Sequence, residues 1–378
     1  MKVCNYLHAY RYEQIDHRTK LDSGSVEPAE FDRFSLRRGD VVVTKDSEDR
    51  FDIGVPTVIA DEFDDLVCGY HLAILRPRPD QIYPQVLAGA LQLPAVRNEL
   101  ASRANGVTRF GLTLRDLGDT LIPLPPRYVQ DRIVEVASQW AQEERRLLQI
   151  ASAKQKRMRG LLEQLCTGRR RLADHESCGW SIVKLGALFH SRKENGHDGL
   201  AVRSVTLRNG LVDRITLERK TESSLSPREH LLARKGDIVY NMMRMWQGAS
   251  GVAESDAIVS PAYVVLQPTC LVDSLFAAFW FKSNRMVHLF WAYSHGLTDD
   301  RLRLYAKDFS MIPVMVPENV DEQRAIAEVL KTAQQEIGWL KQLRELIRKQ
   351  KRGLMQKLLT GQIRVPIAQP ESADRSPA

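Results

Sequence analysis

The chain lacks the features that mark zinc-binding, disulfide-rich, exported and membrane proteins. Its five cysteines stand far apart in 378 residues, without a C-x-x-C pair or clustered histidines, which argues against a zinc site and against a disulfide framework. Its most hydrophobic stretch, residues 275–293, is interrupted by Lys282, Asn284 and Arg285 and is therefore too polar to span a membrane. Because no signal peptide precedes Val3, we expect a cytoplasmic protein that is neither exported nor inserted in a membrane.

Catalytic and cofactor motifs are also missing. There is no G-x-x-x-x-G-K-[ST] and no Gly-rich loop after a predicted strand, so neither ATP nor adenosylmethionine has an evident site. The nearest match to an amino-methyltransferase motif, residues 124–128 (LPPRY), lacks the polar residue that holds the target amino group, and we interpret it as a stiff structural link. We therefore expect no catalytic residue, no metal and no cofactor, and a chain that is not itself an enzyme.

What the chain does have is an ordinary globular composition with an excess of positive charge. Apolar residues make up 43% and charged residues 27%, and the net charge is +7. This composition is typical of a soluble protein of two or three domains, and the charge suits an anionic partner. The basic residues gather in two segments, 154–171 and 341–364.

The sequence is duplicated. Residues 129–172 align without a gap on residues 322–365, and the match places Gln130 on Gln323. It extends upstream, where the same short motifs recur in order in both halves: R-[RK]-G-D at 37–40 and 234–237, G-x-T at 106–108 and 296–298, and I-P at 122–123 and 312–313. Between these anchors the two halves differ almost freely. The chain therefore contains two copies of one unit, with a repeated scaffold and a divergent surface.

Each copy predicts an α+β domain followed by a long helix. Short β-branched or aromatic runs bounded by Gly, Asp or Pro predict strands, and residues 84–104 and 273–294 have helical patterns. A Pro-bounded link then leads into a helix that ends at Thr-Gly, where glycine adopts the left-handed cap. We predict two repeated α+β domains separated by two long helices, with these parts: 1–126 first domain, 127–172 first helix, 173–317 second domain, 318–365 second helix and 366–378 a disordered tail.

The two long helices show a heptad pattern. In the second helix the seam consists of Leu330, Ala333, Ile337, Leu340, Ile347, Leu354 and Leu358, with polar interruptions at Arg344 and Lys351. In the first it consists of Ala137, Trp140, Leu147, Ala151, Met158, Leu161 and Leu165, with interruptions at Glu144 and Lys154. This pattern predicts a coiled coil. Since a domain lies between the helices, we expect them to pair antiparallel within the chain, with pseudo-two-fold symmetry.

These repeats resemble the DNA-specificity (S) subunit of type I restriction-modification systems. The resemblance covers nearly the whole chain and rests on the doubled plan, on EQRAIAEVL at 322–330 and KQKRGLMQKLLTG at 349–361, and on Trp180 with Lys184-Leu185-Gly186 at the start of the second domain. It implies two target-recognition domains, each reading one half of a bipartite, asymmetric site in double-stranded DNA. It also implies that the helices space the domains and dock two methyltransferase (M) subunits, and that a nuclease/translocase (R) subunit joins for restriction.

One departure from the family pattern concerns the first domain. The second repeat opens with residues 179–200, whereas the first begins near the counterpart of Val202, so we expect the first domain to lack its N-terminal start. The alternative function is accordingly a truncated, partly inactive subunit that acts only as a coiled-coil scaffold.

Candidate DNA-binding residues lie in the divergent segments and in the G-x-T turns. Residues 241–247 follow a predicted strand and offer Asn241, Arg244 and Gln247 for base edges and Trp246 for a base or sugar, although Met and Trp here also suit a domain core. The matching segment of the first domain offers Lys45 and Arg50, with a solvated loop as the alternative. Arg109 and Arg301 follow the G-x-T turns and suit DNA contact or an ordinary salt bridge.

Two other basic groups have different interpretations. The residues Arg37-Arg38 and Arg234-Lys235 recur with the scaffold, which favours a structural turn or a phosphate contact. The basic helix ends suit the DNA backbone, a solvated helix face or a partner subunit.

Overall fold

The computed structural model describes residues 1–176, 178–216, 225–298 and 301–364, and the predicted disordered tail lies outside them. The chain divides into two compact units, one formed by Met1–Leu148 with Gln342–Ala378 and the other by Gln149–Lys341. Each unit thus combines one α+β domain with parts of both long helices. No helix among the described residues is long and apolar enough to cross a membrane.

The first domain packs short helices on small sheets. Its main sheet has the order β2-β6-β4-β8, and two smaller sheets are β3-β1-β7 and β5-β9. Helices α3 and α4 each begin with proline at the first helical position, where the missing N–H has no helical partner to lose. The elements are β1 (Lys2–Cys4), α1 (Tyr6–Arg11), β2 (Gln14–Ile15), β3 (Asp22–Ser23), α2 (Pro28–Phe34), β4 (Val41–Thr44), β5 (Asp46–Ser47), β6 (Pro56–Ile59), β7 (Leu66–Cys68), β8 (Leu72–Leu75), α3 (Pro84–Leu91), α4 (Pro94–Arg103), β9 (Phe110–Gly111) and α5 (Leu114–Gly118).

The second domain has two four-stranded sheets and an outer strand pair. The sheet orders are β11-β18-β15-β16, β13-β12-β17-β14 and β10-β19. The elements are η1 (Ala173–His175), β10 (Trp180–Lys184), α7 (Leu185–Leu188), β11 (Phe189–Arg192), β12 (Val202–Thr206), β13 (Gly210–Asp213), η2 (Arg214–Thr216), η3 (Pro227–Glu229), β14 (Leu231–Ala233), β15 (Ile238–Asn241), η4 (Met245–Gln247), β16 (Ser250–Val252), β17 (Ala257–Val259), β18 (Tyr263–Pro268), α8 (Ser274–Trp280), α9 (Asn284–Ala292), α10 (Ala306–Met311) and β19 (Pro313–Pro317).

The two domains share their strand pairing. In each, a central strand pairs antiparallel with two neighbours: β4 with β6 and β8, and β15 with β16 and β18. In each, an early strand pairs parallel with a later one: β1 with β7, and β12 with β17. The predicted α+β class and the duplication are therefore confirmed at the level of the fold.

The two predicted helical segments are each split in two. Residues 84–104 form α3 and α4, because Pro94 opens a new helix after a break at Gln92 and Leu93. Residues 273–294 form α8 and α9, because the Ser283 side chain accepts a hydrogen bond from the Met286 N–H and caps a new helix.

The repeated R-[RK]-G-D motif is a structural turn. Asp40 and Asp237 are buried, and each accepts a hydrogen bond at 2.9 Å from the backbone N–H three residues earlier, on Arg37 and Arg234. The intervening glycines have φ near 92° and 91°, a conformation that favours glycine over every other residue. The turn therefore recurs because the fold needs it.

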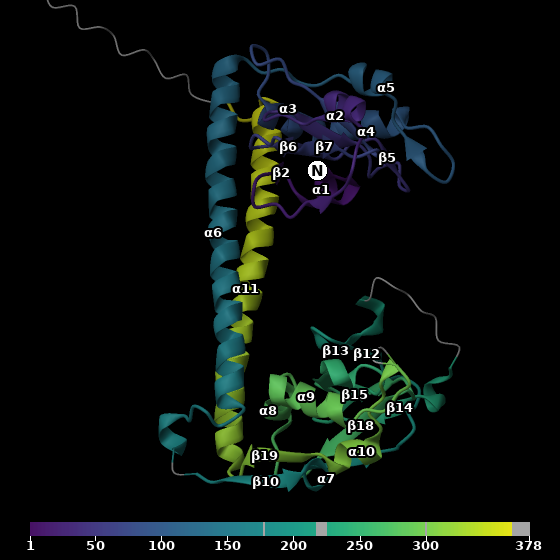
Figure 1. Ribbon diagram of the computed structural model, residues 1–378, viewed down its shortest axis with the longest axis vertical. Helices are drawn as coiled ribbons and strands as arrows, with labels where there is room; N and C mark the ends of the chain where they lie inside the picture. The colour runs from purple at the N-terminus through teal and green to yellow at the C-terminus, as the bar shows by residue number, and fades with distance from the viewer. Residues whose placement is uncertain (177, 217–224, 299–300, 365–378) are drawn as a thin grey trace, which may run out of the picture. The chain divides into compact units, whose positions relative to one another are not determined.

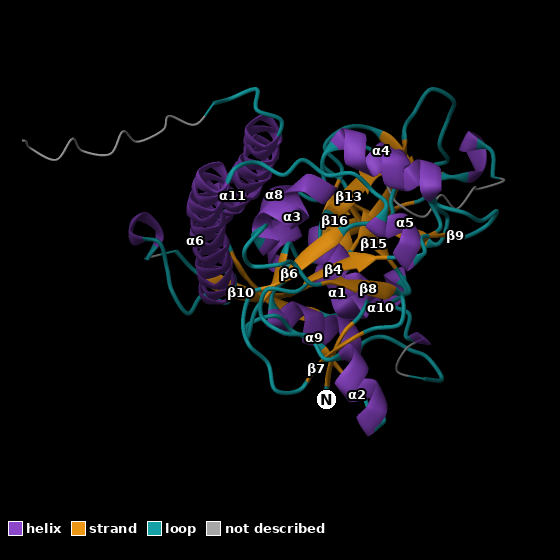
Figure 2. Cartoon of the chain, turned by 90° about the horizontal axis from the view of Figure 1, so that it is seen from above, coloured by secondary structure: helices purple, strands orange, loops and turns teal. Residues whose placement is uncertain are grey.

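The long helices α6 (Arg127–Leu165) and α11 (Val320–Leu359) lie side by side (Figures 1 and 2). Every predicted seam residue of both helices, the polar interruptions included, is buried or half-buried. Within the second unit, Lys154 pairs with Glu336 at 2.6 Å and Arg171, further along the chain, pairs with Glu322 at 2.7 Å. Since the residue numbers increase along one partner while they decrease along the other, the two helices run antiparallel, as predicted. Gly168 and Gly361 end them with φ of 72° and 71°.

A buried glutamine ties each long helix to the domain that precedes it. The side-chain amide of Gln130 donates to the carbonyls of Gln81 and Pro125 and accepts from the Tyr83 N–H. Gln323 makes the same three bonds, to Leu271, Pro317 and Asp273. Because both glutamines are almost fully buried, these bonds fix the angle at which each helix leaves its domain.

Residues 180–192 supply two strands of the second domain that have no counterpart among the described residues of the first. In the second domain β10 pairs with β19 and β11 pairs with β18. Among the described residues of the first domain, the outer edge of β8 has no partner strand, and residues 121–126 form no strand. Instead β2 extends the main sheet at its opposite edge, beside β6.

The buried carboxylate of the repeated turn has its arginine partner on a different segment in each domain. In the second domain Arg192 of β11 forms an ion pair with the buried Asp237, with 2.7 Å between Nε and Oδ2. In the first domain the equivalent carboxylate, Asp40, is paired by Arg76, which follows β8, at 2.7 and 2.8 Å. The buried carboxylate is therefore neutralised from a different strand.

Candidate nucleic-acid interface

The two candidate segments of the first domain lie together. Strand β5, which begins one residue after Lys45, pairs antiparallel with β9, which begins one residue after Arg109. The guanidinium of Arg50 lies over the ring of Phe110 at 5.1 Å and donates to the carbonyl of Ala104. The segment 45–50 and the G-x-T turn therefore form one surface.

Two of the three basic candidates on this surface, Arg109 and Lys45, have their side chains held by neighbouring groups. Arg109 donates to Asp46 at 2.8 Å, and the same carboxylate lies 2.7 Å from Nδ1 of His71. The Arg109 side chain nevertheless stays 55% exposed. The Lys45 ammonium lies 4.7 Å from the ring centre of Tyr70, an arrangement that favours a cation. Lys45 and Arg109 are thus held in place, Arg109 exposed and Lys45 half-buried.

Sequence reasoning missed Tyr70, which is 83% exposed beside Lys45. An exposed aromatic ring next to a cation is a common element of surfaces that contact nucleic acids. The signal in the sequence was an aromatic residue in the Gly-Tyr-His turn between two strands.

In the second domain, residues 241–247 divide between the core and the surface. Met245 is fully buried in the main hydrophobic cluster, as the core interpretation predicts. Asn241 accepts a hydrogen bond from the Met243 N–H, and the indole N–H of Trp246 donates to the Met243 carbonyl at 3.0 Å. Asn241 and Trp246 therefore shape the loop with their polar groups.

The remaining two candidates of this loop face solvent. Arg244 immediately precedes the short helix η4, Gln247 is its last residue, and both are exposed. The chain then reverses at Gly248, whose φ of 82° caps the turn. Their guanidinium and amide groups are of the kind that make bidentate contacts with base edges.

The G-x-T turn of the second domain lies beside this loop. The Leu304 N–H donates to the Met242 carbonyl at 3.0 Å, and His295 and Arg303 exchange backbone hydrogen bonds. Arg301 is exposed, and its N–H donates to the Thr298 carbonyl at 3.0 Å. Both domains thus bring the same two segments together, although the side chains they carry differ.

Lys282 is a second residue that sequence reasoning missed. Its ammonium is mostly buried and donates to the carbonyls of Gly248 and Ser250, directly after the 241–247 loop. Burial lowers its pKa to about 8. The sequence signal was a lysine inside the most hydrophobic stretch of the chain.

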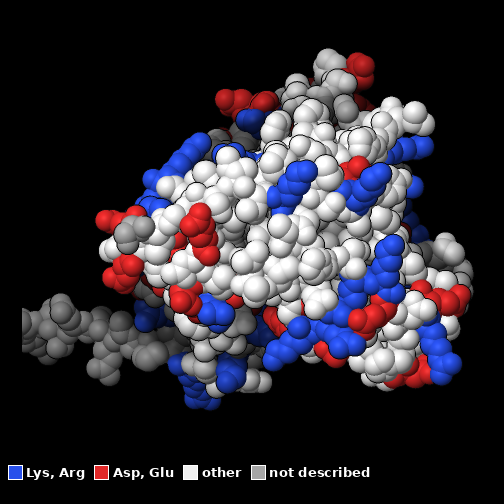
Figure 3. All heavy atoms as spheres, turned by 90° about the horizontal axis from the view of Figure 1, so that it is seen from below, with Lys and Arg blue, Asp and Glu red and all other residues white. Residues whose placement is uncertain are grey.

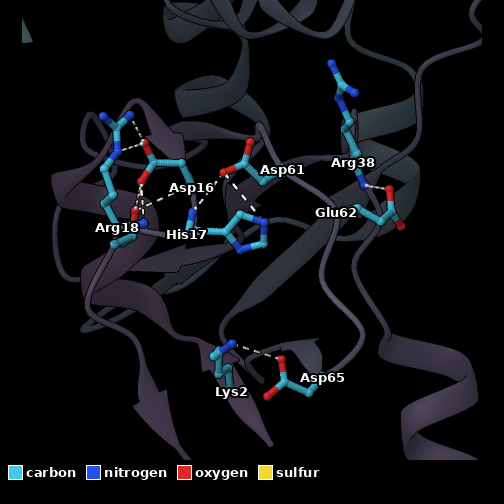
Figure 4. Close-up of polar contacts among 9 residues, drawn as sticks. Lys2, Asp16, His17, Arg18, Arg38, Asp61, Glu62 and Asp65 are labelled. Carbon is cyan, nitrogen blue, oxygen red and sulfur yellow. Dashed lines mark hydrogen bonds and ion pairs between the residues drawn. The ribbon is translucent and has the colours of Figure 1, made fainter.

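Other basic residues have structural or solvent-facing positions. The Arg38 N–H donates to Glu62 at 3.3 Å, while its guanidinium points away from that carboxylate (Figure 4). Among the basic helix ends, Lys154 pairs with Glu336 and Lys351 pairs with Glu13. On the face that Figure 3 shows, the described Lys and Arg side chains stand in separate groups with Asp and Glu between them.

Comparisons with known proteins agree with this architecture. No protein-family model and no curated protein matches the sequence. A chain from a type I restriction-modification (R-M) structure, which describes complex assembly and conformational transition, matches with a TM-score of 0.53 and 18% identity over 87% of this chain and 83% of that one.

Two S subunits also match. The HsdS subunit from Thermoanaerobacter tengcongensis has a TM-score of 0.42 and 18% identity, over 86% of this chain and 80% of that one. The S subunit from M. genitalium has a TM-score of 0.48 and 15% identity, over 92% and 88%.

The fold therefore defines a class: paired α+β domains carried on two antiparallel helices. The match at a TM-score of 0.53 identifies this as a fold of type I restriction-modification systems. The resemblance drawn from the sequence is confirmed at the level of the fold.

Proposed function

We propose that this chain is the sequence-specific DNA-binding subunit of a type I restriction-modification complex, without an active site of its own. Each α+β domain reads one half of a bipartite, asymmetric site in double-stranded DNA. The observation that carries this proposal is that one scaffold occurs twice and presents different exposed side chains at the same place. A surface that varies on a constant support suits the reading of two different half-sites.

The proposed readers are the exposed polar residues of the paired segments. In the second domain Arg244 and Gln247 contact base edges, Arg301 contacts the adjacent backbone, and Asn241 and Trp246 hold the loop in shape. In the first domain the contacts come from Lys45, Arg50 and Arg109. The exposure of Arg50, Arg109, Arg244, Gln247 and Arg301 supports these roles, and Lys45 is half-buried beside Tyr70.

The long helices are proposed to space the two domains and to dock two methyltransferase (M) subunits, with restriction/translocase (R) subunits joining the complex. Several large apolar side chains of these helices are exposed, among them Leu148, Trp339 and Leu346. Exposed apolar residues on a paired helix suit packing against further helices.

The proposal is tested by co-expressing the chain with its methyltransferase subunit in a methylation-free host and mapping modified adenines by single-molecule sequencing. We expect a bipartite motif with a fixed spacer. An assembled complex that leaves the DNA unmodified would contradict the reading function, and failure to assemble would contradict the family assignment.

A domain exchange tests whether the two domains read independently. Replacing residues 179–310 by the equivalent domain of another such protein should change one half-site only, and Arg244→Ala with Gln247→Ala should relax that same half-site. Deleting one heptad from the paired helices should change the spacer. Alteration of both half-sites by the exchange would show that the domains do not act separately.

A further inference from the structure

The first unit contains a cavity of about 420 Å³ between α3 and the C-terminal part of α11. Helix α3 lines it with Gln85, Ala88 and Gly89, and its C-cap residue Gln92 continues the same face, since it lies three and four residues after Gly89 and Ala88. The cavity is thus formed by a regular face of the domain and by a regular face of the long helix. Two of its walls are therefore helical, and Glu13 and Phe51 line it from loops.

The face that α11 presents to this cavity is strongly basic. Arg348, Lys351 and Arg352 line it, and Arg97 of α4 adds a fourth cation. Glu13 is the one acidic residue among the lining side chains, and it forms an ion pair with Lys351. When Glu144, which lies 3.7 Å from Arg348, is also counted, four cations face two carboxylates, and the net positive charge that remains favours an anionic occupant.

Two of these cations are incompletely satisfied or open to solvent. The Nε of Arg348 is buried without a hydrogen-bond partner among the described residues; its nearest carboxylate oxygen, on Glu144, is 3.7 Å away. Arg352 is exposed. A buried guanidinium N–H without a partner costs free energy, which a bound anion would recover.

The fold itself does not require this cavity, because the second copy fills the same place. When Gly106 is aligned on Gly296, Gly89 falls on Phe279, which is 7% exposed in the main core of the second domain. The helix repeat likewise aligns Lys351 on Met158, a residue that packs against that core. The first copy therefore has a polar cavity where the second has an apolar core.

The lining groups specify the chemistry of an occupant. Guanidinium and ammonium groups bind phosphate, and the amides of Gln85, Gln92 and Asn98 offer the donors and acceptors that pair with the edge of a heterocyclic base. The ring of Phe51, which is 63% exposed at the same cavity, suits stacking on a base. The volume lies within the usual range for small-molecule sites.

We propose that this cavity binds a nucleoside phosphate, with the phosphates toward α11 and the base toward α3 and Phe51. The site belongs to the first unit alone and does not depend on the proposed DNA-reading function. A ligand bound there would contact both the first domain and α11.

Calorimetric titration of the purified full chain with ATP, adenosine and inorganic triphosphate tests the proposal. We expect saturable binding of ATP, and weaker binding of adenosine and of inorganic triphosphate, because each of these lacks one half of ATP. Arg352→Glu should weaken ATP binding about tenfold or more, since it removes a charge-assisted contact and adds a repulsive charge. The matched control is Arg159→Glu, because Arg159 is the exposed counterpart of Arg352 in the first helix repeat and should leave binding unchanged.

A second variant closes the cavity. Gly89→Phe introduces the residue found at the aligned position of the second copy, and the new Cβ would lie 3.1 Å from Cδ1 of Leu359 and 3.5 Å from Cε of Met355, both ends of flexible side chains. We expect it to abolish ATP binding while the circular dichroism spectrum stays unchanged. The proposal is overturned if ATP does not bind saturably, if Arg352→Glu and Arg159→Glu weaken binding equally, or if inorganic triphosphate binds as tightly as ATP.

Discussion

Replacing Arg192 by Met should strongly destabilise the second domain. The Arg192 side chain is 9% exposed and its partner Asp237 is 4% exposed. The Asp237 carboxylate also accepts the Arg234 N–H, so it cannot turn away without breaking the repeated turn. Removing one partner of a buried ion pair leaves an uncompensated charge and costs about 3–5 kcal/mol.

The first domain provides an internal comparison for this prediction. Its equivalent carboxylate, Asp40, is 2% exposed, but the partner Arg76 is 50% exposed. Water therefore screens this pair and can solvate the carboxylate when the arginine is lost. We expect Arg76→Met to cost the first domain only about 1–2 kcal/mol.

Hydrogen exchange measured by mass spectrometry on the full chain separates the two effects. Peptides report each domain by itself, which matters because a chain of two units need not unfold in one step. Arg192→Met should accelerate exchange in β15 and β18 about 100-fold or more, following the 3–5 kcal/mol loss. Arg76→Met should accelerate exchange in β4 and β8 by a smaller factor, of about ten.

A surface pair in the same domain serves as the control. Arg203 pairs with Asp213, whose side chain is 53% exposed, so Arg203→Met should change exchange by less than about fivefold. Equal effects of Arg192→Met and Arg203→Met would refute the reasoning from burial. A larger effect of Arg76→Met than of Arg192→Met would refute the argument that solvent replaces the arginine.

Two further predictions concern Lys282 and the buried glutamines. Burial lowers the pKa of Lys282 to about 8, below its ordinary value of 10.5. Because the unfolded state then binds more protons between these two values, the stability of the second domain should rise as pH increases from about 8 to 10.5. Hydrogen exchange of the 248–252 peptide, corrected for intrinsic rates, measures this rise, and the same pH dependence in Lys282→Met would contradict the prediction. Gln323→Leu leaves two carbonyls and one N–H without their hydrogen-bond partner and should lower the stability of the second unit by about 3 kcal/mol or more. Gln130→Leu should lower the stability of the first unit by a similar amount. Urea denaturation should show lower midpoints for both variants, and an unchanged midpoint would show that water replaces the amide.

Several features of the fold follow from the sequence alone because they depend on local periodicity and on repetition. The heptad spacing identified the buried seam of both helices, including the polar positions Glu144 and Lys154. The gapless repeat identified two copies of one α+β unit, and Thr-Gly marked both helix ends. The helical patterns at 84–104 and 273–294 are confirmed as helices, each divided in two by a proline or by a capping serine.

The sequence places the candidate residues in two kinds of segment, and the fold decides which side chains of those segments face solvent. The divergent segments and the G-x-T turns do lie together, because β5 pairs with β9 in the first domain and the Leu304 N–H donates to the Met242 carbonyl in the second. Which side chains face solvent depended on partners far away in the sequence: Arg109 pairs with Asp46, and Arg50 lies over Phe110. Tyr70 and Lys282 had no motif to mark them, since their roles come from neighbours that only folding supplies.

The sequence by itself determined that the protein is a duplicated α+β chain joined by a coiled coil, because hydrophobic spacing and repetition are properties of the chain. The tertiary structure decided how the two copies differ. It showed that Arg76 replaces Arg192 at the buried carboxylate and that Gly89 and Lys351 leave a basic cavity where Phe279 and Met158 fill a core. These differences arise from contacts between residues far apart in the chain, whose burial and charge balance are fixed when the fold brings them together.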